Sequence, residues 1–287
     1  MNAIRIALIR TLGLGILIAL AGCEGSGLER SLAPDPKLTS PTPVTSPTPK
    51  ITDAPTPTPT PEVIIPEPSP TPVIGATIDL TAVPPALQPL VQQVLNLNVI
   101  PSAAVQLDQP VTRRQFARWL LAVQQRLYPD QIERQVRPAT SGSTPLFADV
   151  PRSDPDFAAI QGLAEAGIIP SRFTQSPAPT RFQPDQPLNR ATLVAWKVSL
   201  DVPGALPPGS VAEVSKLWGF QDAAKLNPPT LAALVADANH EPSTVRRVWG
   251  RTRLFLPEKP VSQAQALAAL WSLGSGDTLV TAQNALK

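Results

Sequence analysis

Phe182-Gln183-Pro184-Asp185-Gln186-Pro187-Leu188-Asn189-Arg190 has two counterparts in this chain. The earlier one is Val105-Gln106-Leu107-Asp108-Gln109-Pro110-Val111-Thr112-Arg113, and the later one is Phe255-Leu256-Pro257-Glu258-Lys259-Pro260-Val261-Ser262-Gln263. The three copies align without a gap, and each leads into an apolar stretch with helical spacing. Such repetition indicates that one supersecondary unit is used three times. A unit repeated in this way favours a scaffold or a binding module over a catalytic centre.

Each copy is predicted to end at the start of a helix. A proline stands just before a capping residue, which is Thr112, Asn189 or Ser262. Gln115 and Gln265 follow at the position that completes a capping box. Apolar stripes then recur at helical spacing, as Phe116/Trp119/Val123, Leu193/Trp196/Leu200 and Ala266/Ala269/Leu273. We expect the three stripes to pack around one axis, with both tryptophans in the core.

A second, earlier helix is predicted in each unit and is clearest in the middle one. Phe147-Ala148-Asp149-Val150 comes first, and the helical spacing then runs from Phe157 to Ala164. Gly167 follows at a position suited to a positive φ, which ends the helix. The unit therefore reads as helix, loop, helix, and Asp149 is expected to cap the turn that follows it.

These motifs resemble S-layer homology (SLH) repeats, and the resemblance covers roughly residues 75–274. The matching residues of the middle copy are Phe147, Asp149, Val150, Phe157, Gly167, Ile168, Phe182, Pro184 and Arg190. Those of the third are Phe220, Asp222, Phe255 and Pro257, and those of the first are Asp79, Val99-Ile100 and Thr112-Arg113. The expected repeats are 73–128, 145–202 and 216–274, followed by a tail, 275–287. Departures are the long spacing between copies, Phe157 in place of the usual Trp, and Gln263 in place of an arginine.

The resemblance implies a mostly α fold, a pseudo-threefold spindle of three helix-loop-helix repeats around a central helical bundle. It also implies non-covalent binding of a cell-wall polysaccharide or of peptidoglycan in grooves between the repeats. The arginine of the family's Thr-Arg-Ala-Glu motif contacts a carboxylate of the ligand, which makes Arg113 and Arg190 the first glycan-binding candidates. Arg181 and Trp249 are further candidates. Structural motif roles are expected for Phe147, Asp149, Gly167, Phe182, Asp222 and Phe255.

The arginine positions are chemically suited to an anion. Arg113 and Arg190 are each expected at the first helical position, where the guanidinium, free backbone N–H groups and the positive end of the helix dipole meet. A bidentate contact from arginine to a carboxylate is stronger than a neutral hydrogen bond. The alternatives are a solvated charge, or an ion pair with Asp108 or Asp185. Trp249 lies in an arginine-rich stretch that also fits a solvated charged face.

The N-terminal segment, 1–22, has the features of a lipoprotein signal peptide. Arg5 and Arg10 precede a short apolar core, Thr11 to Leu20, which is too short to span a membrane. The run ends in Leu20-Ala21-Gly22-Cys23, which resembles a lipobox, and Cys23 is the only cysteine. We expect lipidation of Cys23 and a membrane as a partner. A buried, inert cysteine and an uncleaved signal anchor are the alternatives.

Residues 23–72 are predicted to form a disordered tether. Proline, threonine and serine dominate from Pro34 to Pro72, a composition that favours extended polyproline II. At about 3.1 Å per residue this segment reaches at most about 120 Å. We expect it to hold a domain away from a membrane in the bacterial envelope. The outer membrane facing the periplasm is favoured, and the outer face of the cytoplasmic membrane is the alternative.

Composition argues against several other functions. A net charge of +2 and the lack of a basic run interleaved with aromatic residues argue against nucleic-acid binding. The single histidine, His240, has no cysteine to join it at a metal, and no catalytic triad or phosphate loop is legible. Asp154 and Asp156 are expected to be exposed turn acids. We therefore expect no enzyme activity, no cofactor and no metal. The alternative to wall binding is a degenerate SLH scaffold that docks another envelope protein.

Overall fold

The computed structural model describes residues 78–202 and 204–287, which lie within the compact unit Pro66–Lys287. The described chain is mostly helical, which confirms the mostly α prediction. Cys23, the signal segment 1–22 and the tether 23–72 lie outside the described residues. The α-helices are α1 (Gln88–Leu95), α2 (Arg113–Leu127), α3 (Phe157–Glu165), α4 (Arg190–Asp201), α5 (Val211–Trp218), α6 (Pro228–Ala238), α7 (Thr244–Trp249), α8 (Gln263–Ala269) and α9 (Ala282–Ala285). Strands β1 (Ser272–Leu273) and β2 (Val280–Thr281) pair antiparallel, and 3-10 turns span Ser102–Ala104, Ala223–Lys225 and Gly276–Thr278.

The helix starts follow the predicted capping chemistry. Thr112 and Ser262 close capping boxes with Gln115 and Gln265, and Asn189 accepts a hydrogen bond from the Thr192 N–H. These caps place α2, α4 and α8 directly after the three motif copies. The end of α3 also follows the prediction, because Gly167 adopts a φ of +79° just beyond it. A side chain at Gly167 would strain this left-handed turn.

The three motif copies pair through their backbones in a closed ring. The Val111 N–H donates to the Val261 carbonyl at 2.9 Å, Val261 donates to Leu188 at 2.9 Å, and Leu188 donates to Val111 at 2.8 Å. Two more such rings run in the opposite direction, in which each copy donates to the next one along the chain and the third donates to the first. Their donors are the N–H groups of Arg113, Arg190, Gln263, Arg114, Ala191 and Ala264. Val111, Leu188 and Val261 are fully buried. The ring therefore satisfies backbone groups that would otherwise be buried without partners.

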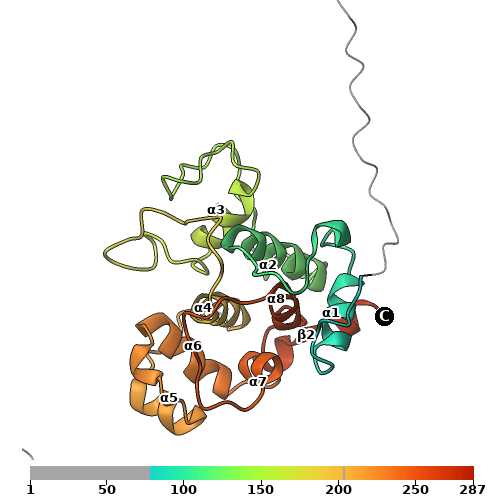
Figure 1. Cartoon of the computed structure of the whole chain (residues 1–287). Coiled ribbons are helices and arrows are strands. Elements are labelled where there is room, and N and C mark those ends of the chain that lie inside the picture. Colours follow the sequence, from blue (N-terminus) through green and yellow to red (C-terminus); the bar gives the residue numbers. More distant parts are fainter. Residues whose placement is uncertain (1–77, 203) are drawn as a thin grey trace, which may run out of the picture. The chain divides into compact units, whose positions relative to one another are not determined.

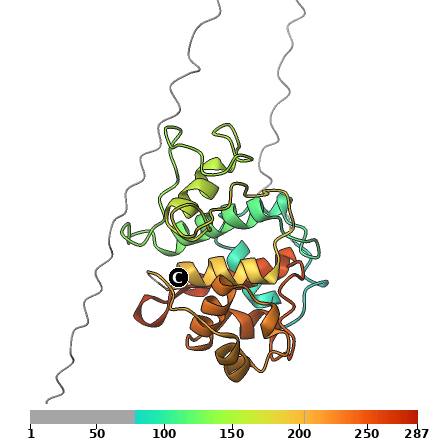
Figure 2. The ribbon, with the colours of Figure 1, turned by 90° about the vertical axis from the view of Figure 1, so that its left-hand side faces the viewer.

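Helix packing runs from the first unit to the second, from the second to the third, and from the third back to the first. Helix α2 packs against α3, α4 against α6, and α8 against α1, so the second helix of each unit meets the first helix of the next. Figure 1 shows α4 and α8 near the centre, with α1 and α6 outside them. Figure 2 shows α2 and α4 lying alongside each other. Trp119 and Trp196 are buried as predicted. Each unit therefore completes its hydrophobic packing only with a neighbouring unit.

The carboxylates of Asp149 and Asp222 accept hydrogen bonds from the motif copies rather than from the turns that follow the two acids. The Asp149 carboxylate accepts hydrogen bonds from the N–H groups of Phe182 and Gln183, both at 2.8 Å. Asp222 accepts from Phe255 and Leu256 at 2.9 and 2.7 Å. The prediction that Asp149 caps the turn that follows it is therefore wrong, since its partners lie 33 and 34 residues away. Gln183 and Leu256 have φ near +60°, a conformation that costs energy without such support.

We expect Asp149→Ala to lower the free energy of unfolding by about 1 to 3 kcal/mol, because two donors lose a charged acceptor that is only half-buried. Burial opposes the charged form, but the hydrogen bonds from Phe182 and Gln183 hold the pKa of Asp149 below its ordinary value. This stabilisation is therefore present above the unfolded pKa of about 3.9 and is lost as pH falls through the lower folded value. Urea unfolding of both proteins at pH 7 and pH 3 measures the effect, and a difference that fails to shrink at pH 3 would contradict it.

The C-terminal segment 275–287 belongs to the packed structure. Strand β2 pairs with β1 in the register Ser272↔Thr281 and Leu273↔Val280, and α9 contacts α1 and α2. Ala282 is fully buried. This segment, set apart as a tail from the sequence, therefore helps to close the fold. Among the described residues, every helix is too short or too polar to cross a membrane.

Candidate functional site

A cavity of about 200 Å³ lies where the first two units meet the third. The N-terminus of α2 contributes Arg113, the loop before α4 contributes Arg181 and Phe182, and the first turn of α6 contributes Thr230. Trp196 of α4 lies at the same cavity. The fold thus brings together two of the predicted glycan-binding residues, Arg113 and Arg181, from different units.

Arg113 is held in place while its terminal nitrogens stay available. Its Nε donates to the Phe182 carbonyl at 2.7 Å. Its guanidinium carbon lies 4.9 Å from the Phe182 ring centroid and 5.0 Å from that of Trp196, which is cation–π geometry. Burial lowers the pKa of Arg113, against the attraction of Asp149, yet the group remains charged at neutral pH. Of the Arg113 side-chain nitrogens, only Nε makes a hydrogen bond with the described residues.

Thr230 adds a hydroxyl group that the sequence did not reveal as functional. Its side chain is 1% exposed, and its Oγ1 has no hydrogen-bond partner among the described residues. Asn227 caps α6 by accepting from the Thr230 N–H at 3.0 Å, which fixes the first turn. A buried hydroxyl without a partner is costly, so a polar ligand group or a water in the cavity would stabilise it. Asn227-Pro228-Pro229 predicts a helix start from the sequence. That Thr230 lines the same cavity as Arg113 follows only from the tertiary structure.

Free helix N–H groups do not contribute to this site, contrary to the prediction. The Arg113 and Arg114 N–H groups donate to the carbonyls of Gln186 and Pro184, and the Thr112 hydroxyl takes the Gln115 N–H. The same holds at α4, where the Arg190 N–H donates to Lys259. The backbone rings between the copies use these donors. Any anion contact at α2 therefore comes from side chains and from the helix dipole.

Arg190 and Trp249 form a second cluster that is closed to solvent. Arg190 is 8% exposed, donates through Nη1 to the Phe255 carbonyl at 3.0 Å, and has its guanidinium carbon 4.9 Å from the Trp249 ring centroid. Arg190 Nε and Trp249 Nε1 are buried without described partners. The cluster repeats the Arg113 arrangement one unit later, but the indole covers the guanidinium. Arg190 is therefore less accessible to a ligand than Arg113.

The third junction uses Gln263 in place of arginine. Its side-chain oxygen accepts a hydrogen bond from the Gln106 N–H at 2.9 Å. Arginine, which has no acceptor, cannot make this contact. Gln263 is 4% exposed, so the junction is closed by a neutral side chain. This contact explains physically why the third copy departs from the motif.

The acids near the first junction bind other arginines. Arg114 contacts Asp185 at 2.8 Å, Asp154 at 3.1 Å and Asp156 at 3.2 Å. Arg118 also contacts Asp156, at 3.0 Å. The expectation that Asp154 and Asp156 are exposed is wrong, because their side chains are 10% and 2% exposed. Since these acids pair with Arg114 and Arg118, they leave Arg113 free for a ligand.

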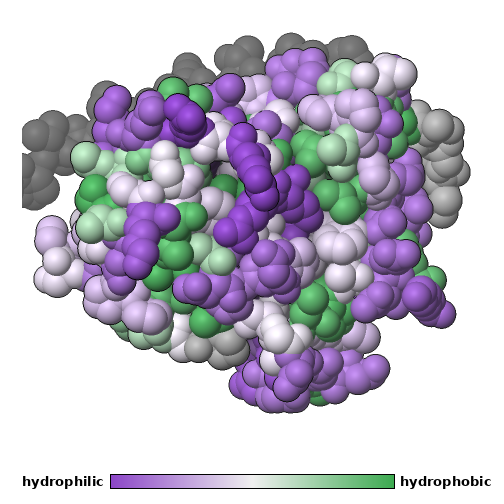
Figure 3. Space-filling model, turned by 90° about the horizontal axis from the view of Figure 1, so that it is seen from below, coloured by the Kyte–Doolittle hydropathy of each residue, from purple (hydrophilic) through white to green (hydrophobic). Residues whose placement is uncertain are grey.

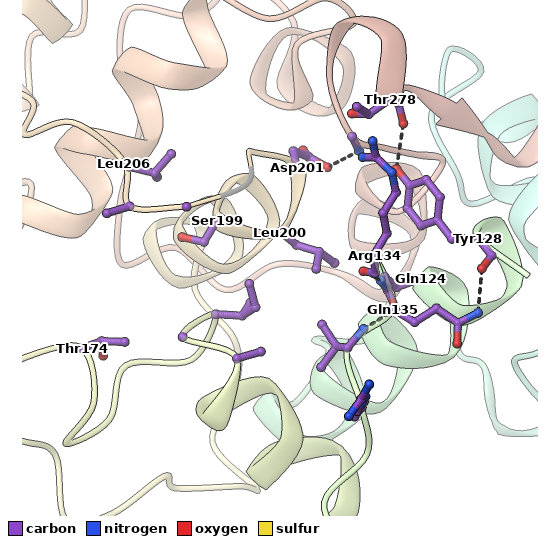
Figure 4. Close-up of a pocket in the computed structure, with 18 of the residues that line it drawn as sticks. Gln124, Tyr128, Arg134, Gln135, Thr174, Ser199, Leu200, Asp201, Leu206 and Thr278 are labelled. Carbon is purple, nitrogen blue, oxygen red and sulfur yellow. Dashed lines mark hydrogen bonds between the residues drawn. The ribbon is translucent and has the colours of Figure 1, made fainter. Parts of the chain in front are cut away.

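A larger cavity, of about 1150 Å³, lies beyond the C-terminal ends of α2 and α4 (Figure 4). Its polar groups largely bond to one another. The Tyr128 hydroxyl donates to the Thr278 carbonyl at 2.9 Å, and Asp201 accepts from the Gly274 N–H at 3.0 Å. Burial raises the pKa of Tyr128 to about 12. Ile132 and Phe173 on its walls are 66% and 60% exposed. The cavity offers apolar contacts more than unpaired polar groups.

Comparison with known proteins returned neither a matching family model nor a matching curated protein. In the part of the chain that the structure describes, His, Asp and Glu side chains form no cluster that could hold a metal ion.

Proposed function

We propose that this protein is an envelope lipoprotein that binds a cell-wall polysaccharide or peptidoglycan through three SLH-like repeats. Acylated Cys23 holds it in a membrane, and the Pro/Thr-rich tether spans the distance to the wall. Under this proposal the three units correspond to the three lobes of an SLH-like spindle, and the cavity at Arg113 takes the glycan. The observation that carries this proposal is the meeting of Arg113 and Arg181, from two different units, in one cavity.

The electrostatics of the cavity suit an anionic sugar. Arg113 stacks on Phe182 and Trp196, so its orientation is fixed before a ligand arrives. Such preorganisation reduces the entropic cost of binding. Arg181 is exposed beside it, which gives the cavity two positive charges. A carboxylate gains a charge-assisted contact from Arg113.

Two anchors on one chain make modest glycan affinity sufficient. Once the lipid is in a membrane, the tether limits the volume that the binding unit explores. The effective concentration of the second contact therefore rises without any new interaction. The protein thereby links membrane to wall.

Co-sedimentation tests this function. Full-length protein in detergent is spun with isolated wall sacculi before and after removal of their secondary polymer. Binding that is lost with the polymer identifies an anionic polysaccharide as the ligand, and binding that survives identifies peptidoglycan. Failure to bind either preparation contradicts wall anchoring.

A second candidate function is a scaffold that docks another envelope protein without glycan. The Ile132 and Phe173 side chains favour it, because both line the 1150 Å³ cavity and together offer a partner an exposed apolar contact there. Under this function the Arg113 cavity plays no part. Serine substitutions at Ile132 and Phe173 would then abolish the partner contact, whereas Arg113→Ala would leave it unchanged.

A further inference from the structure

A third cavity, of about 300 Å³, lies within the third unit and shares no residue with the Arg113 cavity. It is bounded by the end of α5, by Phe220, and by the segment that runs from α7 through Gly250 to Thr252. Its volume reaches the lower end of the range for small-molecule sites. Its charged lining residues are Arg246 and Arg251, which belong to the arginine-rich stretch around Trp249.

Stacking fixes the Arg246 guanidinium at this cavity. The ring centroids of Phe220 and Trp218 lie 5.5 Å apart with their planes at 6°, and the Arg246 guanidinium carbon lies 4.8 Å from the Trp218 centroid. Trp218 is itself anchored, since its Nε1–H donates to the Leu234 carbonyl at 2.9 Å. A stacked arginine keeps its N–H edge available for an acceptor. The phenyl, indole and guanidinium planes thus form a preorganised anion contact.

The charge balance leaves room for an anion. Arg246 makes a single ion pair within the described chain, at 3.0 Å to Glu241, whose side chain is 78% exposed. Arg251 is exposed and makes no ion pair with described residues. Gly250 turns the chain with a φ of +66°, which brings Arg251 to the cavity that Arg246 lines. An exposed pair such as Arg246–Glu241 is weak, so a ligand anion can displace Glu241.

The surroundings suit a ring that carries the anion. Leu217 is 40% exposed at the cavity and supplies an apolar wall beside Trp218. Figure 3 views the molecule from the side on which α5 lies in Figure 1, and hydrophilic side chains there separate distinct hydrophobic patches. An anionic group at the arginines and a C–H face against Leu217 would use both parts of the site.

We propose that this cavity is a second anion-binding site, which takes a sugar acid or a sugar phosphate. The choice of a sugar rests on the proposed wall binding, whereas the anion site rests on Arg246 and Arg251 alone. A polymer that carries many anionic groups would then contact the unit at two separate places, which raises avidity beyond that of either site.

Calorimetric titration of the full-length Arg113→Ala variant tests this site without the first cavity, so its outcome is independent of wall binding. The probes are glucuronate, glucose 6-phosphate and neutral glucose. We expect saturable binding of at least one anion and none of glucose. The two anions distinguish a carboxylate from a phosphate as the preferred group.

Additional substitutions in the Arg113→Ala background assign the contact. Arg251→Gln and Arg246→Gln are each expected to raise the Kd at least tenfold, and Glu241→Gln to lower it severalfold by removing a competing carboxylate. Arg253→Gln is the matched control, because Arg253 is exposed on the same segment but does not line the cavity. If Arg246→Gln fails to fold, the Kd of the Arg251→Gln variant, which changes an exposed side chain, tests the site. The proposal is overturned if neither anion binds, if Arg251→Gln leaves the Kd unchanged, or if glucose binds as tightly as the anions.

Discussion

Arg113→Ala is expected to weaken binding of the protein to wall sacculi by about 30-fold or more. Removing one partner of a desolvated, hydrogen-bonded charge contact costs about 2 kcal/mol or more. The loss falls on Arg113 because its guanidinium packs against the stacked rings of Phe182 and Trp196 at the cavity and makes no ion pair with a described carboxylate. Co-sedimentation over a range of sacculus concentrations gives the ratio of affinities.

Two variants separate the specific contact from a general loss of charge. Arg118→Ala removes the same charge from the same helix, but Arg118 is 48% exposed, pairs with Asp156 and does not line the cavity. We expect its binding to match that of the unsubstituted protein. Arg113→Lys keeps the charge and loses the planar fork, so it should bind with intermediate affinity. Equal losses in Arg113→Ala and Arg118→Ala would show that only net charge matters.

Lys197→Met is expected to lower the free energy of unfolding by about 3 to 5 kcal/mol, because it leaves a buried carboxylate without its main partner. Lys197 is 1% exposed on α4 and forms a buried ion pair with Asp201, one turn later. Burial lowers the pKa of Lys197 and raises that of Asp201, each against the attraction of the other. Urea unfolding at pH 7 measures the loss.

A paired substitution and a pH series test the cause. Adding Asp201→Asn to Lys197→Met should restore most of the stability, since no buried charge remains and the amide oxygen can still accept from the Gly274 N–H. In Lys197→Met alone, the folded pKa of Asp201 lies above its unfolded pKa. The loss of unfolding free energy is therefore complete above the folded pKa and disappears below the unfolded pKa. The difference in the free energy of unfolding between Lys197→Met and the unsubstituted protein should therefore become smaller from pH 7 to pH 4. A pH-independent gap would point to lost packing instead.

Local features of this fold could be read from the sequence because their signals lie within a few residues. The caps at Thr112, Asn189 and Ser262 and the glycine that ends α3 are of this kind. Each depends on a side chain and a backbone group less than one helical turn apart. Helix α5 carries an equally local signal, the capping box of Ser210 and Glu213, which lies outside the repeated motif.

The site could be predicted only in part because its members come from distant segments. The motif predicts Arg113 as a ligand contact and Arg181 is a further candidate beside it, but Thr230 reaches the same cavity from a different unit. The partners of the Arg113 and Arg190 N–H groups lie on neighbouring motif copies, so no single copy reveals that these donors are occupied. Burial of Arg190 under Trp249 likewise depends on how α4 meets α7.

The cyclic backbone pairing has a consequence for how this architecture can change. An open array of repeats gains or loses a unit at either end and keeps its remaining contacts. Here the first and last motif copies bond directly, as Gln106 does with Gln263 across 157 residues. Deleting any one unit would leave two unpaired surfaces, and inserting a fourth would need a ring of different curvature. Variation is therefore confined to loops such as those that carry α5 and α7, while the number of units stays at three.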